Sequence, residues 1–450
     1  MLILPEKAAG YYCDIGNEYL NQRNETLMNV DEIRFYKMLL IIVLIISFSV
    51  YSQKKEITFT LDGYIDYALS HNPSIHAAGS SIKASMQEIR LATALPDPMI
   101  MGRAGIDNGL MPASIGVSQM IMQPVTIAFE KKYAKYKKEA EEARLYQAAS
   151  DVVYRVRSIY FILYETGQLI KIKNQNLALL RQYEELTKTA YANGTAAQSS
   201  LIKVGLEISR LEDGIRSDEL KTVTLHQELA AVLGINEYVK FPFPESKPLL
   251  KNAIQPDSIV LLVQNKYPGL NAMRKEILSE KAMQASAKSR FLPDISFGIE
   301  YMKSSDAITG SAADETWMLS PSVSLSIPVW FGKKAALVQK AGFNAMKMEQ
   351  QTNNMQNMIV AQAVMFKNEL HDAQLKEKLL SEVLVPQARQ MLVLMENEYR
   401  TGISRSLDVL DGQRMLFDLE MEKIMEQTRA LNAEAALLQL VGDTGMAEPQ

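Results

Sequence analysis

Methionine is the residue type in this chain that is best suited to bind a ligand. The chain has 24 methionines but a single cysteine, and its four histidines form no ligand-spaced pair. Met99 and Met101 share one face of an expected strand, and Met120 and Met122 share a face of the next. Thioether sulfurs are soft ligands that suit Cu(I) or Ag(I). Methionine also fills irregular apolar gaps, so a metal path along these residues is an alternative to ordinary packing.

The rest of the composition gives no basis for catalysis. A single cysteine excludes a disulfide framework and a cysteine zinc site. The sequence contains neither a Gly-rich phosphate loop nor a nucleophile elbow, and its net charge of -4 provides no basic footprint for nucleic acid. With 47% hydrophobic and 22% charged residues, the chain can bury a large core. We therefore expect a folded protein that is not an enzyme, needs no cofactor and binds no nucleic acid.

Two pairs of strands are expected to position the methionines. The clearest strand, 316–327, alternates serines with apolar residues, and its partner 294–302 also alternates. The first pair, at about 99–106 and 114–122, alternates less regularly. Small polar residues on one face and apolar residues on the other are typical of a membrane β-barrel, and a half-buried sheet in water is the alternative. The apolar face of the clearest strand consists of Trp317, Leu319, Pro321, Val323, Leu325 and Ile327.

Two strand pairs are too few to close a barrel. An open sheet edge in lipid leaves backbone groups unpaired, at a cost of several kcal/mol each. If these strands span a membrane, several copies of the chain must therefore share one barrel. Two copies would give about eight strands, which side chains fill, whereas three would give about twelve and leave a lumen. A conduit accordingly needs at least three copies.

The same plan occurs twice along the chain. A turn that ends in proline, a Leu-Pro-Asp turn, two strands and a long helical hairpin occupy residues 53–236 and again 257–442, separated by a Pro-rich linker at 237–256. The hairpin tips are expected at Gly194 and Gly402, because glycine readily adopts the left-handed conformation that ends a helix. This duplication indicates a repeat architecture whose function depends on shape.

The helices predicted between the strands and the tips are unusually long. The stretch 126–193 contains no proline and would extend on the order of 100 Å as a helix. Its counterpart, 333–400, contains Pro386, which should kink it. Helices of this length that run back antiparallel to one another are typical of coiled-coil hairpins.

The N-terminal region is typical of an export signal. Residues 1–52 are interpreted as a leader and signal peptide, because basic residues precede the apolar run 38–50 and Ser52 is a suitable cleavage residue. The apolar run is shorter than the ~20 residues that a spanning helix needs, and a membrane anchor is the alternative. We place the true start at Met28. Residues 443–450 form a C-terminal tail.

Over residues 57–442 the chain resembles the TolC family of outer-membrane efflux ducts. The most specific part of the resemblance is Tyr399-x-x-Gly402-(x)5-Asp408-Val409-Leu410-Asp411-x-Gln413, and the Leu-Pro-Asp turns support it. The resemblance implies a mostly α-helical fold with a membrane β-barrel portion. Each chain of a homotrimer would contribute its strands to a shared twelve-stranded barrel in the outer membrane of a Gram-negative-type cell. The helices would form a coiled-coil tunnel that reaches into the periplasm.

The resemblance also implies a gate at the periplasmic end of the tunnel. Asp408 and Asp411 align with an acidic ring that would attract cations, although acids in the first turns of a helix also complement its macrodipole. Tyr399 aligns with a tyrosine of the family's closing network. Ser404 stands where that network has an arginine, with Arg405 next along. The closing contacts are therefore expected to be absent or rewired.

The resemblance assigns the hairpin tips, Gly194, Thr195, Gly402 and Ile403, to docking with a periplasmic adaptor (membrane fusion) protein. The expected function is a passive trimeric exit duct, opened by this adaptor and an inner-membrane transporter, most simply of the RND type. It would export small molecules or metal ions. Two alternatives stay open: a duct for type I protein secretion, and a soluble periplasmic coiled-coil scaffold.

Overall fold

A computed structural model of the protein describes most of the chain beyond the expected signal peptide. The chain divides into two units, Met1–Glu56 and Ile57–Gln450, and the described residues all belong to the second. The expected leader and signal peptide, the start at Met28 and Arg405 lie outside them. The described ranges are 59–103, 114–250, 259–304, 316–327, 329–403 and 406–444.

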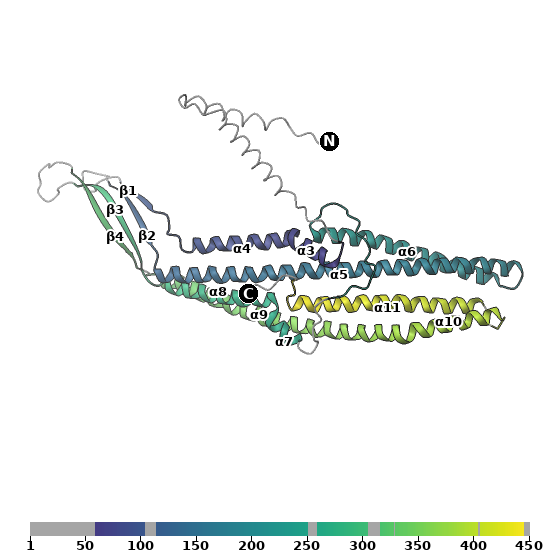
Figure 1. Ribbon diagram of the computed structural model, residues 1–450. Helices are drawn as coiled ribbons and strands as arrows, with labels where there is room; N and C mark the ends of the chain where they lie inside the picture. The colour runs from purple at the N-terminus through teal and green to yellow at the C-terminus, as the bar shows by residue number, and fades with distance from the viewer. Residues whose placement is uncertain are drawn as a thin grey trace, which may run out of the picture. The chain divides into compact units, whose positions relative to one another are not determined.

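In the first half, two short helices precede two strands and a pair of long helices (Figure 1). The longest, α5, has 69 residues, which corresponds to about 100 Å. It begins with proline at its first position, where the missing N–H has no helical partner. The helices that the structure describes in this half are α3 (Leu61–His71), α4 (Pro73–Leu91), α5 (Pro124–Ala192) and α6 (Gln198–Leu233).

The second half repeats this order with one difference. Its helices are α7 (Ile259–Lys266), α8 (Pro268–Ser289), α9 (Phe331–Leu379), α10 (Val385–Arg400) and α11 (Ser406–Leu440). Between α9 and α10 lies a π-helical segment, η2 (Leu380–Leu384). Pro386 is the second residue of α10, just after this segment. It has no N–H to donate, and its ring crowds the carbonyl one turn earlier, so the backbone widens there. The expected interruption at Pro386 thus takes the form of a π turn.

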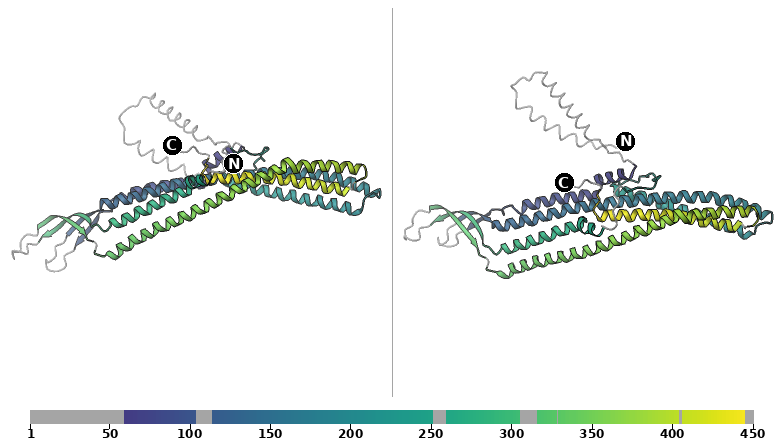
Figure 2. Two further views of the ribbon diagram at one scale, coloured as in Figure 1. Left: turned by 90° about the horizontal axis from the view of Figure 1, so that it is seen from below. Right: turned by 60° about the horizontal axis from the view of Figure 1, so that its bottom comes forward.

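The four strands form one antiparallel sheet in the order β1 (Met99–Arg103), β2 (Ser114–Ile121), β3 (Asp294–Ser304) and β4 (Thr316–Ser326). The central pair joins the two halves of the chain, with Ser114 opposite Met302. β1 and β4 are the edges of this sheet. The strands lie at one end of the helices and both hairpin tips at the other (Figure 2).

The serine-rich face of the sheet, called the inner face below, is the more buried of its two faces. Ser114 and Ser118 are buried, whereas Val323 on the opposite face is exposed. A Cβ added at Gly298 would lie 2.7 Å from Ser322 Oγ, so neighbouring strands crowd together on this side. Small residues permit this close approach. The apolar residues point outward, as the alternation predicted for a barrel wall.

Each half has its own core near the middle of the helices. In the first, Tyr64, Leu229 and Phe241 are almost fully buried among α3, α5 and α6. In the second, Leu270 and Ile359 belong to a cluster of α7, α8, α9 and α11 that includes several alanines. Alanine lets helix backbones approach closely, so these helices pack without large gaps. The two cores fix the hairpins at their base.

Candidate functional site

The two hairpin tips are built from the same backbone motif. Gly194 and Gly402 adopt φ values of 70° and 78°, in the left-handed region expected from the sequence. The Gly194 N–H donates to Tyr191 O and the following N–H to Ala190 O. Equivalent bonds run from the Gly402 N–H to Tyr399 O and from the Ile403 N–H to the residue before Tyr399. This Schellman motif satisfies the last carbonyls of each helix and turns the chain sharply.

The residues expected to dock an adaptor form the exposed end of the hairpins. Gly194, Thr195 and Gly402 are exposed, and Ile403 is an exposed large apolar side chain. Isolated apolar side chains are common on surfaces, but this one lies at the very end of a hairpin. The adaptor-docking role of these residues stays a prediction.

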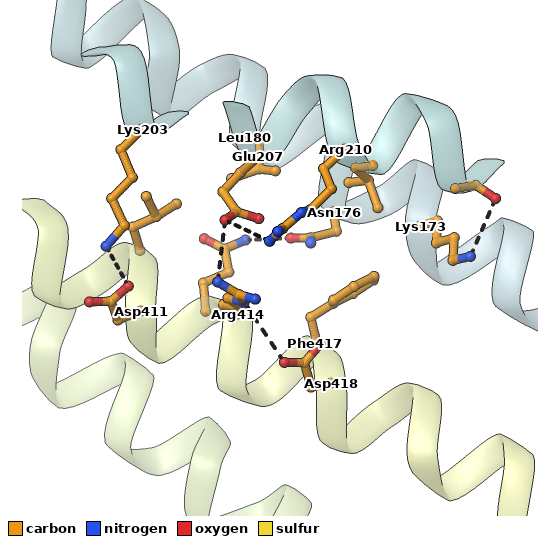
Figure 3. Close-up of a pocket in the computed structure, with 14 residues that line it drawn as sticks. Lys173, Asn176, Leu180, Lys203, Glu207, Arg210, Asp411, Arg414, Phe417 and Asp418 are labelled. Atoms are coloured by element: carbon orange, nitrogen blue, oxygen red, sulfur yellow. Dashed lines mark hydrogen bonds and ion pairs between the residues drawn. The ribbon is translucent and has the colours of Figure 1, made fainter. Parts of the chain in front are cut away.

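An ion pair holds the second hairpin against the first, two helical turns behind the tips. Lys203 Nζ on α6 lies 2.8 Å from Asp411 Oδ1 on α11 (Figure 3). Asp411 therefore has a cation beside it, which weakens the negative potential expected for an acidic ring. The sequence reasoning missed Lys203. A signal for it existed, because Lys203 follows Gly194 at the same distance as Asp411 follows Gly402.

A second link crosses the same gap one turn further along. Arg414 NH1 on α11 lies 3.3 Å from Glu207 Oε1 on α6, and Arg210 NH1 lies 3.6 Å from the same oxygen. Beneath these ion pairs is a cavity of about 190 Å³ whose apolar lining includes Leu180 and Phe417. Figure 3 shows the long side chains that meet across this space. Here α6 and α11 are connected by charged side chains with open space beneath them.

Buried polar groups complete the cavity wall. Gln413 Nε2 on α11 donates to Asn176 Oδ1 on α5 at 3.3 Å. The Gln413 side chain is buried, and its Oε1 has no hydrogen-bond partner in the structure.

A tyrosine also links the two hairpins, and it comes from α5. The Tyr183 hydroxyl donates to Glu396 Oε1 on α10 at 3.4 Å. Burial, followed by the negative charge of Glu396, raises the pKa of Tyr183 to about 12. Tyr399, which the sequence aligned with a closing network, lies half-exposed at the end of α10.

The remaining predicted gate residues are less informative. Asp408 lies in the first turn of α11 and is partly buried, where its charge complements the helix dipole. Arg405 lies outside the described residues. Ser200, which follows Gly194 at the same distance as Asp408 follows Gly402, is buried. The structure thus brings Asp411 together with Lys203, a partner that the sequence reasoning had not named.

The sheet register places most of the predicted methionines on the inner face. Met99 lies opposite Ser118, and Met101 opposite Gly116; Met120 lies opposite Ser296. Met122 does not belong to this set, because β2 ends at Ile121. The ladder of hydrogen bonds ends before Met122 since the chain turns there toward the proline that begins α5.

Two features are absent from the described residues. None of their helices has a segment long and apolar enough to cross a membrane. No three histidine, cysteine, aspartate or glutamate side chains among them are grouped closely enough to hold a metal ion.

Comparisons with known proteins agree with this architecture. Residues 261–443 match the family model described as outer membrane efflux protein. The chain is 20% identical over 408 residues to the solvent efflux pump outer membrane protein SrpC of Pseudomonas putida, covering 84% of each chain.

Solved structures share the fold. A membrane protein from Pseudomonas aeruginosa superposes with a TM-score of 0.73 at 18% identity, covering 85% of this chain and 92% of the other. The outer membrane protein VceC of Vibrio cholerae gives a TM-score of 0.69 at 16% identity, covering 85% and 96%. The chain therefore resembles the TolC family of outer membrane efflux proteins, whose family model residues 261–443 match, and it is a protein of the outer membrane that extends into the periplasm.

Proposed function

We propose that the protein is the passive exit duct of a tripartite efflux system, closed at its periplasmic tip by links between its two hairpins. The observation that carries this proposal is the pair of ion pairs, Lys203–Asp411 and Glu207–Arg414, above a cavity. Exposed ion pairs contribute roughly 0–1 kcal/mol each. Links of this strength are suited to a junction that a partner must open and that then closes again.

The open sheet supports assembly into a trimer. β1 and β4 are edges with unpaired backbone groups, and the outward side chains of β4, such as Leu319 and Val323, are exposed. In lipid, the edges must pair with other copies. Three copies, with β4 of one beside β1 of the next, would close a barrel wide enough for a lumen.

The partners follow from the same arrangement. The exposed tip residues Gly194, Thr195, Gly402 and Ile403 would receive a periplasmic adaptor, and an inner-membrane transporter of the RND type would supply the energy. The duct itself needs no cofactor. Because the relatives are named for solvent and toluene efflux, we assign small apolar molecules as the first substrate class to test. Met99, Met101 and Met120 lie on the inner face of the sheet, so soft metal ions are a second substrate class to test.

The decisive experiment combines mass and conductance. Native mass spectrometry of the detergent-extracted outer-membrane protein should give three times the mass of the mature protomer. The same species in a planar bilayer should conduct weakly, and Asp411→Ala should raise its conductance. A soluble monomer or dimer would contradict the duct. An unchanged conductance in Asp411→Ala, with Lys203→Ala equally silent, would show that these links do not close it.

A further inference from the structure

A charged pair lies on the inner face of the sheet, far from the helices. Arg103 NH1 on β1 is 3.7 Å from Glu300 Oε1 on β3. Arg103 is the last residue of β1 and Glu300 lies in the distal half of β3, so the pair lies toward the end of the sheet that is opposite the hairpins (Figure 1). The strand between them is β2. The pair therefore spans three neighbouring strands.

The position of Glu300 is tightly defined by its surroundings. The Ser114 hydroxyl donates to Glu300 Oε1 at 2.5 Å. Gly116 lies directly opposite Glu300 in the register, and a Cβ added there would lie 3.3 Å from the Glu300 Cβ. A glycine at this point leaves the space that the glutamate and the incoming arginine need. A hydrogen bond to a carboxylate is stronger than one between neutral groups, so Ser114 holds the carboxylate in place.

The two side chains of the pair differ in how much of their surface is exposed on the inner face. The Glu300 side chain is 18% exposed and the Arg103 side chain 71%. The carboxylate lies against the sheet, and the guanidinium extends over it. A solute that passes along this face would therefore meet the cation first. A guanidinium presents several N–H groups in a planar fork that matches carboxylates and similar oxyanions.

The other charge on this face lies at the opposite end of the strand. Asp294 is the first residue of β3, beside the helices, and its partner across the ladder is Ser326. Among the described strand residues, the inner face thus carries an acid near the helices and an exposed cation near the far end. Fixed charges along a pore select ions by sign.

We propose that Arg103, positioned by Glu300 and Ser114, is a selectivity element near the outer end of the duct that favours solutes with a carboxylate or a similar oxyanion. The proposal rests on the shared barrel proposed above. Three copies would place three guanidinium groups around one lumen. Glu300 weakens the positive potential of this ring and orients each guanidinium group. Neutralising Arg103 and neutralising Glu300 should therefore shift the ion preference in opposite directions.

The experiment is a measurement of reversal potential. The full-length trimer is placed in a planar bilayer under a potassium chloride gradient. Relative to the wild type, Arg103→Gln should shift the permeability ratio toward potassium, and Glu300→Gln should shift it toward chloride. Each change should be on the order of a few-fold, because fixed charges set local potentials of a few kT. Arg103→Lys is the matched control and should keep the wild-type ratio.

A second readout tests the chemical class of solute. Benzoate added on the helix side should block potassium chloride current in the wild type more than benzyl alcohol does, and Arg103→Gln should remove this difference. Wild-type reversal potentials in both glutamine variants, each with trimer mass, would overturn the selectivity element and leave the duct intact. A protein that conducts neither as the wild type nor as Asp411→Ala would overturn the duct itself, and this proposal with it.

Discussion

The two longest helical paths of the molecule differ at one point. In the first half, α5 runs without interruption from the sheet to the tip. In the second, the corresponding path passes through α9, the π turn η2 and α10. Their tips end in the same motif, and their bases are both held by buried cores. The difference therefore lies in the shaft of the second hairpin.

This difference indicates which of the two hairpins moves when the tip opens. A π turn interrupts the regular hydrogen-bond pattern of an α-helix and often marks a functional position. Beyond it, the second hairpin contacts the first through exposed ion pairs and a tyrosine hydrogen bond. We expect α5 to act as the fixed member, and the part of the second hairpin beyond Leu384 to move when the tip opens.

The largest effect is expected from placing a proline in α5, at the position that corresponds to Pro386 in the second hairpin. Ala178 precedes Gly194 by the same interval as Pro386 precedes Gly402, and it lies inside α5. Ala178→Pro should lower the free energy of unfolding by about 3 kcal/mol or more, because proline removes a hydrogen bond and clashes with the preceding turn. Thermal unfolding followed by circular dichroism measures this. Ala178→Ser is the control, and a Pro variant as stable as this control would show that α5 tolerates a break.

A charge exchange at the tip should have the next largest effect. Lys203→Glu places two acids together, and Asp411→Lys places two cations together, so each should open the tip and raise bilayer conductance several-fold. The double exchange restores an ion pair and should return the conductance toward the wild-type value. Conductance that stays high in the double exchange would mean that the residues act separately.

The tyrosine link predicts a pH dependence. Because the folded state raises the pKa of Tyr183 from 10.0 to about 12, the neutral hydroxyl stabilises the fold fully below pH 10, and this contribution is lost as the pH rises through about 12. Thermal stability measured across this window should fall more in the wild type than in Tyr183→Phe. Parallel curves for the two proteins would exclude a role for this hydroxyl.

The smallest effect is expected from repairing the π turn. Pro386→Ala restores a backbone N–H and should favour a regular helix through η2. Stability should change little or rise slightly, whereas opening of the tip in the bilayer should become rarer. Single-channel recordings measure the frequency of opening. Recordings identical to those of the wild type would show that the second hairpin does not bend at Pro386.

Local features of this fold could be predicted from the sequence. Alternating serines and apolar residues indicated the strands and their outward faces, because side chains of a strand alternate sides. Gly194 and Gly402 indicated the tips, because few other residues adopt a positive φ. The length of α5 followed from an uninterrupted stretch without proline.

Contacts between distant segments could not be predicted. Periodicity shows which face of a helix is buried, but not which side chain lies opposite, so Lys203 was missed as the partner of Asp411. The same reason applies to Tyr183 and Glu396, and to Arg103 and Glu300. Met122 was placed on a strand because the pattern continued for one residue beyond the hydrogen-bonded ladder.

The pairing of β2 with β3 has a consequence for the order of folding. Ser114 and Glu300, which meet on these strands, are 186 residues apart in the chain, whereas the helical hairpins form from neighbouring segments. Contacts between distant segments form slowly, because a long loop must first be closed. The helical hairpins should therefore form early and the sheet late. Until synthesis reaches β3, the apolar face of β1 and β2 has no partner strand from the second half, and a chaperone that binds extended apolar segments would find its target there.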